Sequence, residues 1–254
     1  MTTSPRIALI TGGNRGIGRS AALQLAHNGV DVLVSYRSHA DEAEAVVASI
    51  SDLGRSAVAL QLDTGDIESL DAFVATMTDV LQHTWNRDSF DFLVNNGGMS
   101  IAGSLATVTA HDFDRLVDVH FKGVFFLTQK LSKLLAENGS IVNVSTGLTR
   151  FTAPQRVIYA SVKGAVEVLT RYLAEVLGPR GITVNTIAPG AVATDFSGGL
   201  LRENEQLRQH IVSLTALGRY AVADDIGGAI AALLGEGNRW VTGQRIEVSG
   251  GLHL

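Results

Sequence analysis

Short apolar runs rich in Val, Ile and Leu alternate along the chain with longer amphipathic segments. Runs of this kind are typical of parallel strands that are buried on both faces. Their alternation with helix-length segments predicts repeated βαβ units. The predicted strands are Arg6–Ile10, Val30–Tyr36, Ala57–Leu62, Phe90–Asn95, Ser140–Ser145, Thr183–Ile187 and Arg245–Val248.

Three of the intervening segments are predicted to be helices, namely Arg19–Asn28, Ala110–Leu135 and Val157–Leu177. No internal repeat, low-complexity tract or Pro-rich linker divides the chain. We therefore expect residues 1–254 to form a single α/β domain, a doubly wound parallel sheet of about seven strands with helices on both faces.

A glycine-rich turn, TGGNRGIG at residues 11–18, directly follows the first predicted strand and opens a helical pattern. Glycines there let the backbone turn tightly and approach a pyrophosphate, which then lies at the helix N-terminus. Because the turn lies between a strand and a helix, it predicts a dinucleotide site. The candidate cofactor-binding residues of this turn are Gly12, Asn14, Arg15, Gly16, Ile17 and Gly18.

The end of the second strand indicates which dinucleotide is bound. An NAD site usually has an acid at this place for the ribose 2′-hydroxyl, whereas a 2′-phosphate requires a cation. Tyr36 occupies the expected place of the acid and Arg37 follows it, while Arg15 is a second cation within reach. Guanidinium suits phosphate geometry, so we predict NADP(H) as the cofactor. Alternatively, both arginines are solvated surface groups.

Tyr159 and Lys163 are four residues apart, and a helix over Val157–Leu177 puts both on one face. A neighbouring cation lowers the pKa of a phenol, so Tyr159 is a candidate general acid or base. Ser145 and Thr146 add two hydroxyl groups just before this helix. The alternative is a tyrosine in the core and a solvated lysine.

Other candidates follow the remaining strands, where ligands bind in open α/β sheets. Asp63 follows the third strand and is either a ligand or a cap. Thr194 is a candidate for a hydrogen bond to a nicotinamide carboxamide, or it caps the segment that follows. The remaining candidates at these strand ends are Asn95, Gly97, Pro189, Gly190 and Val192.

The composition of the chain limits the kinds of molecule that it can bind. The 254 residues carry a formal net charge of −5, which gives no basic footprint for a nucleic acid or an anionic membrane, so we expect a small-molecule partner. The chain has no Cys, which excludes thiolate chemistry and is compatible with a cytoplasmic location, and its seven His are scattered, so no metal site is expected. The apolar run Ile7–Ile10 is too short for a signal-peptide core or a membrane span.

Taken together, these motifs resemble the short-chain dehydrogenase/reductase family in its compact single-domain form, and the likeness extends over essentially the whole chain. The resemblance implies a Rossmann-fold oxidoreductase in which Tyr159 transfers the proton and Lys163 binds the nicotinamide ribose while lowering the tyrosine pKa. It also implies that Asp63 lies near the adenine and Asn95 near the adenosine ribose.

The chain departs from the family pattern at three places. The family's catalytic serine usually lies 13 positions before the tyrosine, where this chain has Thr146. We favour Thr146 over Ser145 for polarising the substrate oxygen, because Thr146 lies at the position of the family's serine. Its hydroxyl offers the same donor and acceptor as a serine hydroxyl. His120 replaces an asparagine that supports a water relay, and it either joins this relay or only fills the space. Gly97 replaces an alanine beside the nicotinamide pocket.

The predicted activity is reversible hydride transfer between NADPH and a ketone. The alternatives are a 3-oxoacyl carrier-protein reductase and, more remotely, a catalytically inactive NADP-binding regulator. The resemblance further suggests a homotetramer or a dimer. We expect a mobile lid over Asp195–Gln209, extending to about residue 215. The predicted substrate pocket is lined by residues 99–101, Leu148, Phe151, Val157, Ala191 and Phe196.

Overall fold

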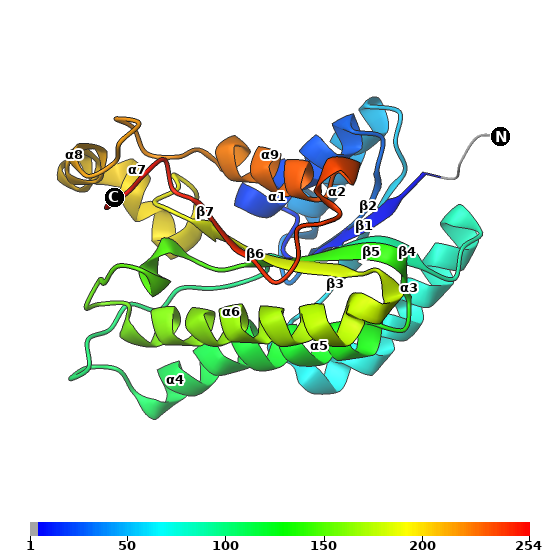
Figure 1. Ribbon diagram of the computed structural model, residues 1–254, viewed down its shortest axis with the longest axis horizontal. Coiled ribbons are helices and arrows are strands. Elements are labelled where there is room, and N and C mark those ends of the chain that lie inside the picture. Colours follow the sequence, from blue (N-terminus) through cyan, green and yellow to red (C-terminus); the bar gives the residue numbers. More distant parts are fainter. Residues whose placement is uncertain (1–4) are drawn as a thin grey trace.

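The computed structural model describes residues 5–254. Within this range, seven strands form one parallel sheet in the order β3-β2-β1-β4-β5-β6-β7, which confirms the predicted doubly wound fold (Figure 1). Each predicted strand is present, with ends that differ by up to five residues. The strands are β1 (Ile7–Ile10), β2 (Asp31–Tyr36), β3 (Ala57–Gln61), β4 (Phe90–Asn95), β5 (Leu135–Val144), β6 (Thr183–Pro189) and β7 (Arg245–Val248).

Helices cover both faces of the sheet (Figure 1). Helices α1, α2 and α9 lie on one face and α3, α4, α5 and α6 on the other, while α7 and α8 lie beyond the sheet, near the C-terminus. The helices are α1 (Gly16–His27), α2 (Ala40–Asp52), α3 (Leu70–Trp85), α4 (Ala110–Val117), α5 (Gly123–Leu131), α6 (Val157–Leu177), α7 (Leu200–Glu203), α8 (Glu205–Ser213) and α9 (Ala223–Leu233).

The apolar runs of the strands supply two cores, one on each face. Successive strand residues point to opposite faces, so Ile7 and Leu9 pack in the core beneath α3 and α5. Ala8 and Ile10 pack in the core beneath α1 and α9. All four are fully buried. This two-sided burial explains why the strand reads as a continuous apolar run.

The predicted helix Ala110–Leu135 was wrong in its continuity and in its end. Helix α4 passes at Asp118–Lys122 into a π-helical turn, α5 ends at Leu131, and Leu135 already belongs to β5. A π-turn leaves the apolar pattern helical in appearance, so periodicity does not reveal it. The turn contains His120 and therefore lies at the predicted site.

Hydrogen bonds to neighbouring strands fix the loops at the carboxyl ends. The Thr11 N–H donates to the Val94 carbonyl at 3.0 Å, and the Ser145 N–H donates to the Ile187 carbonyl at 2.7 Å. These bonds continue the strand ladders by one residue. The candidate residues that follow β1 and β5 therefore stand on a rigid edge of the sheet.

Two features are absent from the described residues. No helix there is long and apolar enough to span a membrane. No group of three or more His, Asp or Glu side chains in that range could hold a metal ion.

Candidate active site

A cavity of about 430 Å³ opens at the carboxyl ends of the strands. The loops that follow β1, β2, β4, β5 and β6 all contribute to its walls, together with α6 and the segment of α7 and α8. One end of the cavity is formed by the glycine-rich turn and Arg37, and the other by apolar side chains around Phe196. Motifs far apart in the sequence thus meet in one place.

The glycine-rich turn packs closely against its own helix. A Cβ on Gly18 would lie 2.2 Å from the Gly12 carbonyl oxygen, so no larger residue fits at this position. Helix α1 begins at Gly16, three residues before the predicted start, and its N-cap residue Arg15 makes no side-chain capping bond. Gly16 and Ile17 line the cavity. The first N–H groups of α1 therefore suit an anionic group such as a pyrophosphate.

The two cations predicted to bind a 2′-phosphate both line the cavity. Arg37 lines the cavity beside Ser38, and Arg15 lines it from the glycine-rich turn. Neither arginine forms an ion pair with any carboxylate in the described part of the chain. Tyr36, in contrast, packs against the apolar core and is not among the lining residues.

Two predicted ligands hold the scaffold instead of lining the cavity. The Asn95 amide donates to Thr128 Oγ1 at 3.1 Å and to Asn143 Oδ1 at 2.8 Å, and it is buried. Its neighbour Asn96 lines the cavity and donates to the Thr11 carbonyl at 2.9 Å. Gly18 likewise packs behind the turn. Sequence reasoning chose Asn95 from the family pattern and missed Asn96.

The other predicted cofactor ligands line the cavity. Asp63 also accepts the Gly65 N–H at 2.9 Å, as a cap does, while its role as a ligand stays a prediction. Asn14 lines the cavity too, although its amide donates to Glu42 Oε2 at 2.6 Å. Thr194 lines the cavity, and its Oγ1 accepts the Phe196 N–H at 3.3 Å just ahead of the 3₁₀ turn whose N-cap is Asp195. The other lining residues of this group are Gly12, Gly97, Pro189, Gly190 and Val192.

The two hydroxyl groups after β5 have different surroundings. Ser145 Oγ donates to Glu167 Oε1 at 2.7 Å, so its hydroxyl proton is already used. Thr146 Oγ1 only accepts the Leu148 N–H at 3.3 Å. Its own proton therefore has no acceptor among the described side chains and is available to a ligand in the cavity. This geometry favours Thr146 as the polarising hydroxyl.

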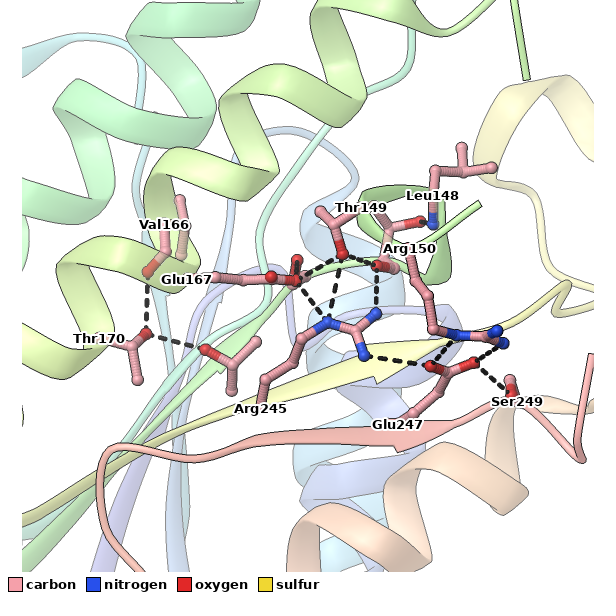
Figure 2. Close-up of polar contacts among 12 residues, drawn as sticks. Leu148, Thr149, Arg150, Val166, Glu167, Thr170, Arg245, Glu247 and Ser249 are labelled. Carbon is pink, nitrogen blue, oxygen red and sulfur yellow. Dashed lines mark hydrogen bonds and ion pairs between the residues drawn. The ribbon is translucent and has the colours of Figure 1, made fainter. Parts of the chain in front are cut away.

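A charged network behind Thr146 holds this loop (Figure 2). Glu167 of α6 accepts from Arg245 Nε of β7 at 2.9 Å, and Arg245 Nη2 donates to the Thr146 carbonyl at 3.3 Å. Glu247 then links Arg245 to Arg150 through contacts of 3.1 and 2.7 Å. Arg150, hydrogen-bonded to Glu247, lowers the pKa of that carboxyl to about 2. Glu247 therefore remains ionised at neutral pH and keeps its pairing with both arginines.

Tyr159 and Lys163 lie on one face of α6 and both line the cavity. Lys163 Nζ donates to the Val144 carbonyl at 2.7 Å and lies 6.0 Å from the centre of the Tyr159 ring. An ammonium has three N–H donors, so two remain for a ligand. The helical register expected from the sequence is confirmed.

The direction of the Tyr159 pKa shift differs from the expectation. Burial raises the pKa of the phenol above its ordinary value, and the positive charge of Arg156 only partly opposes this. Burial also lowers the pKa of Lys163 to about 8. Desolvation penalises the charged form of each group, and for Tyr159 it outweighs the attraction of Arg156. In the protein alone, Tyr159 is thus a neutral proton donor.

His120 is buried and neutral. Burial, aided by the charge of Lys163, lowers its pKa to about 3. Its Nε2 donates to the Met99 carbonyl at 2.7 Å, and its Nδ1 has no hydrogen-bond partner among the described residues. The ring lies edge-on to Tyr159 at 5.3 Å, and a Cβ on Gly98 would come within 2.6 Å of it. This arrangement favours the space-filling interpretation of His120 over a relay that passes through imidazolium.

The apolar end of the cavity agrees with most of the predicted substrate pocket. Met99, Leu148, Phe151, Ala191 and Phe196 line it, as predicted, together with Ser100. The prediction was wrong for two other residues. Ile101 does not line the cavity, and Val157 contributes to a separate hollow beyond Leu148, because it lies on a more exposed face of α6 than Tyr159.

The predicted lid segment covers this end. After a 3₁₀ turn at Phe196–Gly199, the segment forms α7 and α8 and sends four apolar side chains into the cavity. These side chains are Leu200, Leu201, Leu207 and Ile211. Helix packing and a place in the cavity wall are therefore compatible for these leucines. Mobility of the lid stays a prediction.

Two further lining residues gave no signal in the sequence. Arg156 reaches the cavity from the start of α6, and Leu252 reaches it from the C-terminal segment. That segment is fixed by Arg150, whose guanidinium donates to the carbonyls of Leu252 and His253. Only the folding of the tail against the segment after α8, where Leu252 bridges Thr215, brings Leu252 to the site.

A parallel doubly wound sheet that carries a glycine-rich turn, a tyrosine and lysine on one helix face, and an adjacent free hydroxyl defines a class of nucleotide-binding oxidoreductases. A family model described as enoyl-(acyl carrier protein) reductase matches residues 12–253. The chain belongs to the short-chain dehydrogenase/reductase family.

Relatives of known activity are similar over nearly the whole chain. The 3-oxoacyl-(acyl-carrier-protein) reductase FabG of Staphylococcus aureus is 34% identical over 249 residues, which are 97% of this chain and 98% of that protein. The promiscuous reductase LugOII, which catalyses keto-reduction at C1 in lugdunomycin biosynthesis, is 33% identical with a TM-score of 0.93 over 98% of both chains. The angucycline C-6 ketoreductase LanV, solved with bound NADP, is 35% identical with a TM-score of 0.92 over 98% of this chain and 95% of that one.

Proposed function

We propose that the protein is an NADPH-dependent ketone reductase that works reversibly as a secondary-alcohol dehydrogenase. The observation that carries this proposal is that Thr146, Tyr159 and Lys163 line the same cavity as Arg15 and Arg37. The cavity thus combines a phenol and a hydroxyl, suited to a ketone, with a glycine-rich turn and two cations, suited to the phosphates of NADPH. The ketoreductases LugOII and LanV, with their closely similar folds, support the same activity.

The cofactor NADPH, when bound, supplies the hydride. The residues of this chain orient the substrate and supply the proton. Thr146 Oγ1 donates a hydrogen bond to the substrate carbonyl oxygen and stabilises the charge that grows there. The phenol of Tyr159 gives its proton to the same oxygen. The two free N–H groups of Lys163 suit the ribose hydroxyls, and a ligand that keeps this ammonium charged also favours the tyrosinate left after proton transfer.

The preference for NADPH over NADH is assigned to Arg37 and Arg15. A 2′-phosphate placed beside two unpaired guanidinium groups gains charge-assisted hydrogen bonds that a ribose hydroxyl cannot match. We expect kcat/KM for NADPH to exceed that for NADH, and Arg37→Ala to narrow this ratio by roughly tenfold or more. Steady-state kinetics with both cofactors and one ketone tests this. A preference for NADH in the wild-type protein would refute the assignment.

Reduction of a carrier-bound 3-oxoacyl thioester is the second candidate activity, and the similarity to FabG favours it. A carrier protein is acidic and needs a basic docking face, whereas this chain has a net charge of −5 and four Lys. We therefore rank free ketones first. Rates with an aryl ketone, a 3-oxo ester and a carrier-bound substrate, measured side by side, separate the two activities.

A homotetramer or dimer is the proposed assembly. Several large apolar side chains on the outer face of α6 are exposed, among them Tyr172 at 67% and Val176 at 70%. Apolar groups of this size gain from burial against a second copy of the chain. Light scattering measures the mass directly, and a monomer at working concentration would contradict the proposal. A cytoplasmic location remains an expectation that localisation of a tagged protein tests.

A further inference from the structure

One cation at the substrate end of the cavity has no role in the reaction described above. Arg156 lies immediately before α6, three residues ahead of Tyr159, and lines the same cavity. Its Nη1 donates to Ser100 Oγ, a second lining residue. The backbone bridge between Gly103 and Arg156 fixes the segment from which the side chain extends. The guanidinium is thus held beside the place where the ketone must lie.

The charge of Arg156 is not neutralised by the protein. Among residues 5–254, no carboxylate lies within ion-pair distance of it. Two carboxylates line the cavity: Asp63 lies at the cofactor end, and Asp195 is paired with Arg202. A single hydrogen bond to Ser100 leaves most of the five guanidinium N–H donors unused by side chains. The cavity therefore contains an uncompensated positive charge.

The surroundings of Arg156 strengthen its attraction for an anion. The walls at this end are mainly apolar and come from Phe151, Phe196, Leu200 and Leu252. A charge pair among apolar groups is stronger than one in open water. The Arg156 charge already acts on the neighbouring phenol, because it is the one group that opposes the burial-driven rise of the Tyr159 pKa. An anionic group on a ketone bound beside Tyr159 would be close enough to feel the same charge.

We propose that Arg156 is a substrate-binding residue and that the natural substrate is a ketone bearing an ionised acidic oxygen, a carboxylate or a phenolate, a few bonds from the reacting carbonyl. A planar guanidinium binds such a group through two parallel hydrogen bonds. This fixes the carbonyl relative to Tyr159 and Thr146. The inference rests on the proposed ketone reductase activity and specifies its substrate class.

The test compares charged and neutral forms of one ketone. Rates of NADPH oxidation are measured with a 3-oxocarboxylate and its methyl ester, and with a phenolic aryl ketone, above the pKa of its phenol, and its methyl ether. The variants are wild type, Arg156→Gln and Arg156→Lys. Arg115→Gln is the matched control, because it removes the same charge from a nearby exposed arginine that does not line the cavity.

The ratio of kcat/KM for the anion to that for its neutral partner is the decisive quantity, since any effect of Arg156 on Tyr159 cancels in it. We expect Arg156→Gln to lower this ratio roughly 10- to 100-fold, mainly through KM. Arg156→Lys should retain part of the ratio, and Arg115→Gln all of it. The pair that shows the loss identifies the acid as carboxylate or phenolate.

An unchanged ratio for both pairs in Arg156→Gln would overturn the inference while leaving the ketone reductase proposal intact. No NADPH-dependent reduction of any of the four compounds by the wild-type protein would overturn both. Calorimetric binding of the corresponding 3-hydroxycarboxylate to wild type and Arg156→Gln gives a second readout that does not depend on turnover. Equal affinities there, together with an unchanged phenolate ratio, would also count against the inference.

Discussion

The two sides of the cavity differ in how their polar groups are held. On the side of β5, α6 and β7, Thr146, Tyr159 and Lys163 are buried, and the network of Glu167 and Arg245 holds the loop of Thr146 through the Thr146 carbonyl (Figure 2). On the lid side, Phe196 is 43% and Leu200 46% exposed. The ion pairs there join neighbours in sequence, such as Asp195 with Arg202.

This contrast suggests a division of roles, with the reaction on the buried side and the selection of substrate on the lid side. Buried groups linked across three elements can hold the reacting atoms within the narrow limits that proton transfer requires. A segment held by exposed ion pairs gains little rigidity from them. We therefore expect substitutions on the catalytic side to change turnover and stability, and substitutions in the lid to change mainly the choice of substrate.

After Tyr159 itself, the largest effect should come from the Thr146 hydroxyl. Thr146→Ala removes the donor to the substrate oxygen, and we expect kcat to fall about 10²- to 10³-fold, as for other donors to a developing oxyanion. Ser145→Ala should cost less than about tenfold, because its hydroxyl already bonds Glu167. Parallel steady-state assays compare the two. A larger loss for Ser145→Ala would reverse the assignment.

His120 should make the stability of the protein depend on pH. Its pKa is about 3 in the folded protein, below the value of 6.5 for an ordinary histidine. Between these values the unfolded chain binds a proton that the folded protein does not, so stability is lost as the pH falls from 6.5 toward 3. The loss is about 1.4 kcal/mol per pH unit.

His120→Asn removes this titration. Urea unfolding at pH 7 and pH 5 should show a smaller drop in unfolding free energy for the variant than for the wild-type protein. Equal drops would mean that the imidazole titrates normally. The pH profile of kcat near neutrality should be the same for both proteins. A shift of that profile in His120→Asn would restore the relay hypothesis.

Glu167→Gln tests the charged network that holds the loop of Thr146. The amide keeps the shape but loses the charge that faces Arg245, while Glu247 still pairs with this arginine. We expect a loss of about 1–2 kcal/mol in unfolding free energy and a moderate fall in kcat with little change in KM for the cofactor. Glu175→Gln, at an exposed position two turns further along α6, is the control. Equal effects of the two substitutions would show that the network does not position Thr146.

The smallest effect on stability should come from the lid. Leu200→Ala removes a half-exposed side chain that lines the cavity, so unfolding free energy should change by about 0.5 kcal/mol or less. The KM for a bulky aryl ketone should rise more than that for a small one. Equal changes in both KM values would argue that this side chain does not contact the substrate.

The sequence predicted the fold because burial on both faces of a strand leaves a direct trace, as in the run that contains Ile7 and Ile10. It also predicted the face shared by Tyr159 and Lys163, because helical spacing is local. The break of the helix at Asp118–Lys122 was missed, since a π-turn preserves the apolar pattern. Arg156 and Leu252 were missed because their place at the site depends on how loops and the tail pack in three dimensions.

The direction of the pKa shift of Tyr159 also could not be predicted from the sequence. Spacing places a cation one turn from the phenol, but it gives no measure of burial, and burial is the larger influence in the structure. The choice between Ser145 and Thr146 also needed the structure. Counting positions favoured the threonine, yet only the contact of Ser145 with Glu167 supplies a physical reason.

The central claim is that Tyr159 donates a proton during NADPH-dependent reduction of a ketone. Its most direct test is the rate of NADPH oxidation by wild type and Tyr159→Phe at saturating ketone, with NADPH binding measured by fluorescence in both. We predict a fall in turnover of about 10²- to 10⁴-fold with cofactor affinity nearly unchanged. Substantial ketone reduction by Tyr159→Phe would contradict the mechanism, and NADPH binding by a wild-type protein that reduces no ketone would point to the catalytically inactive regulator.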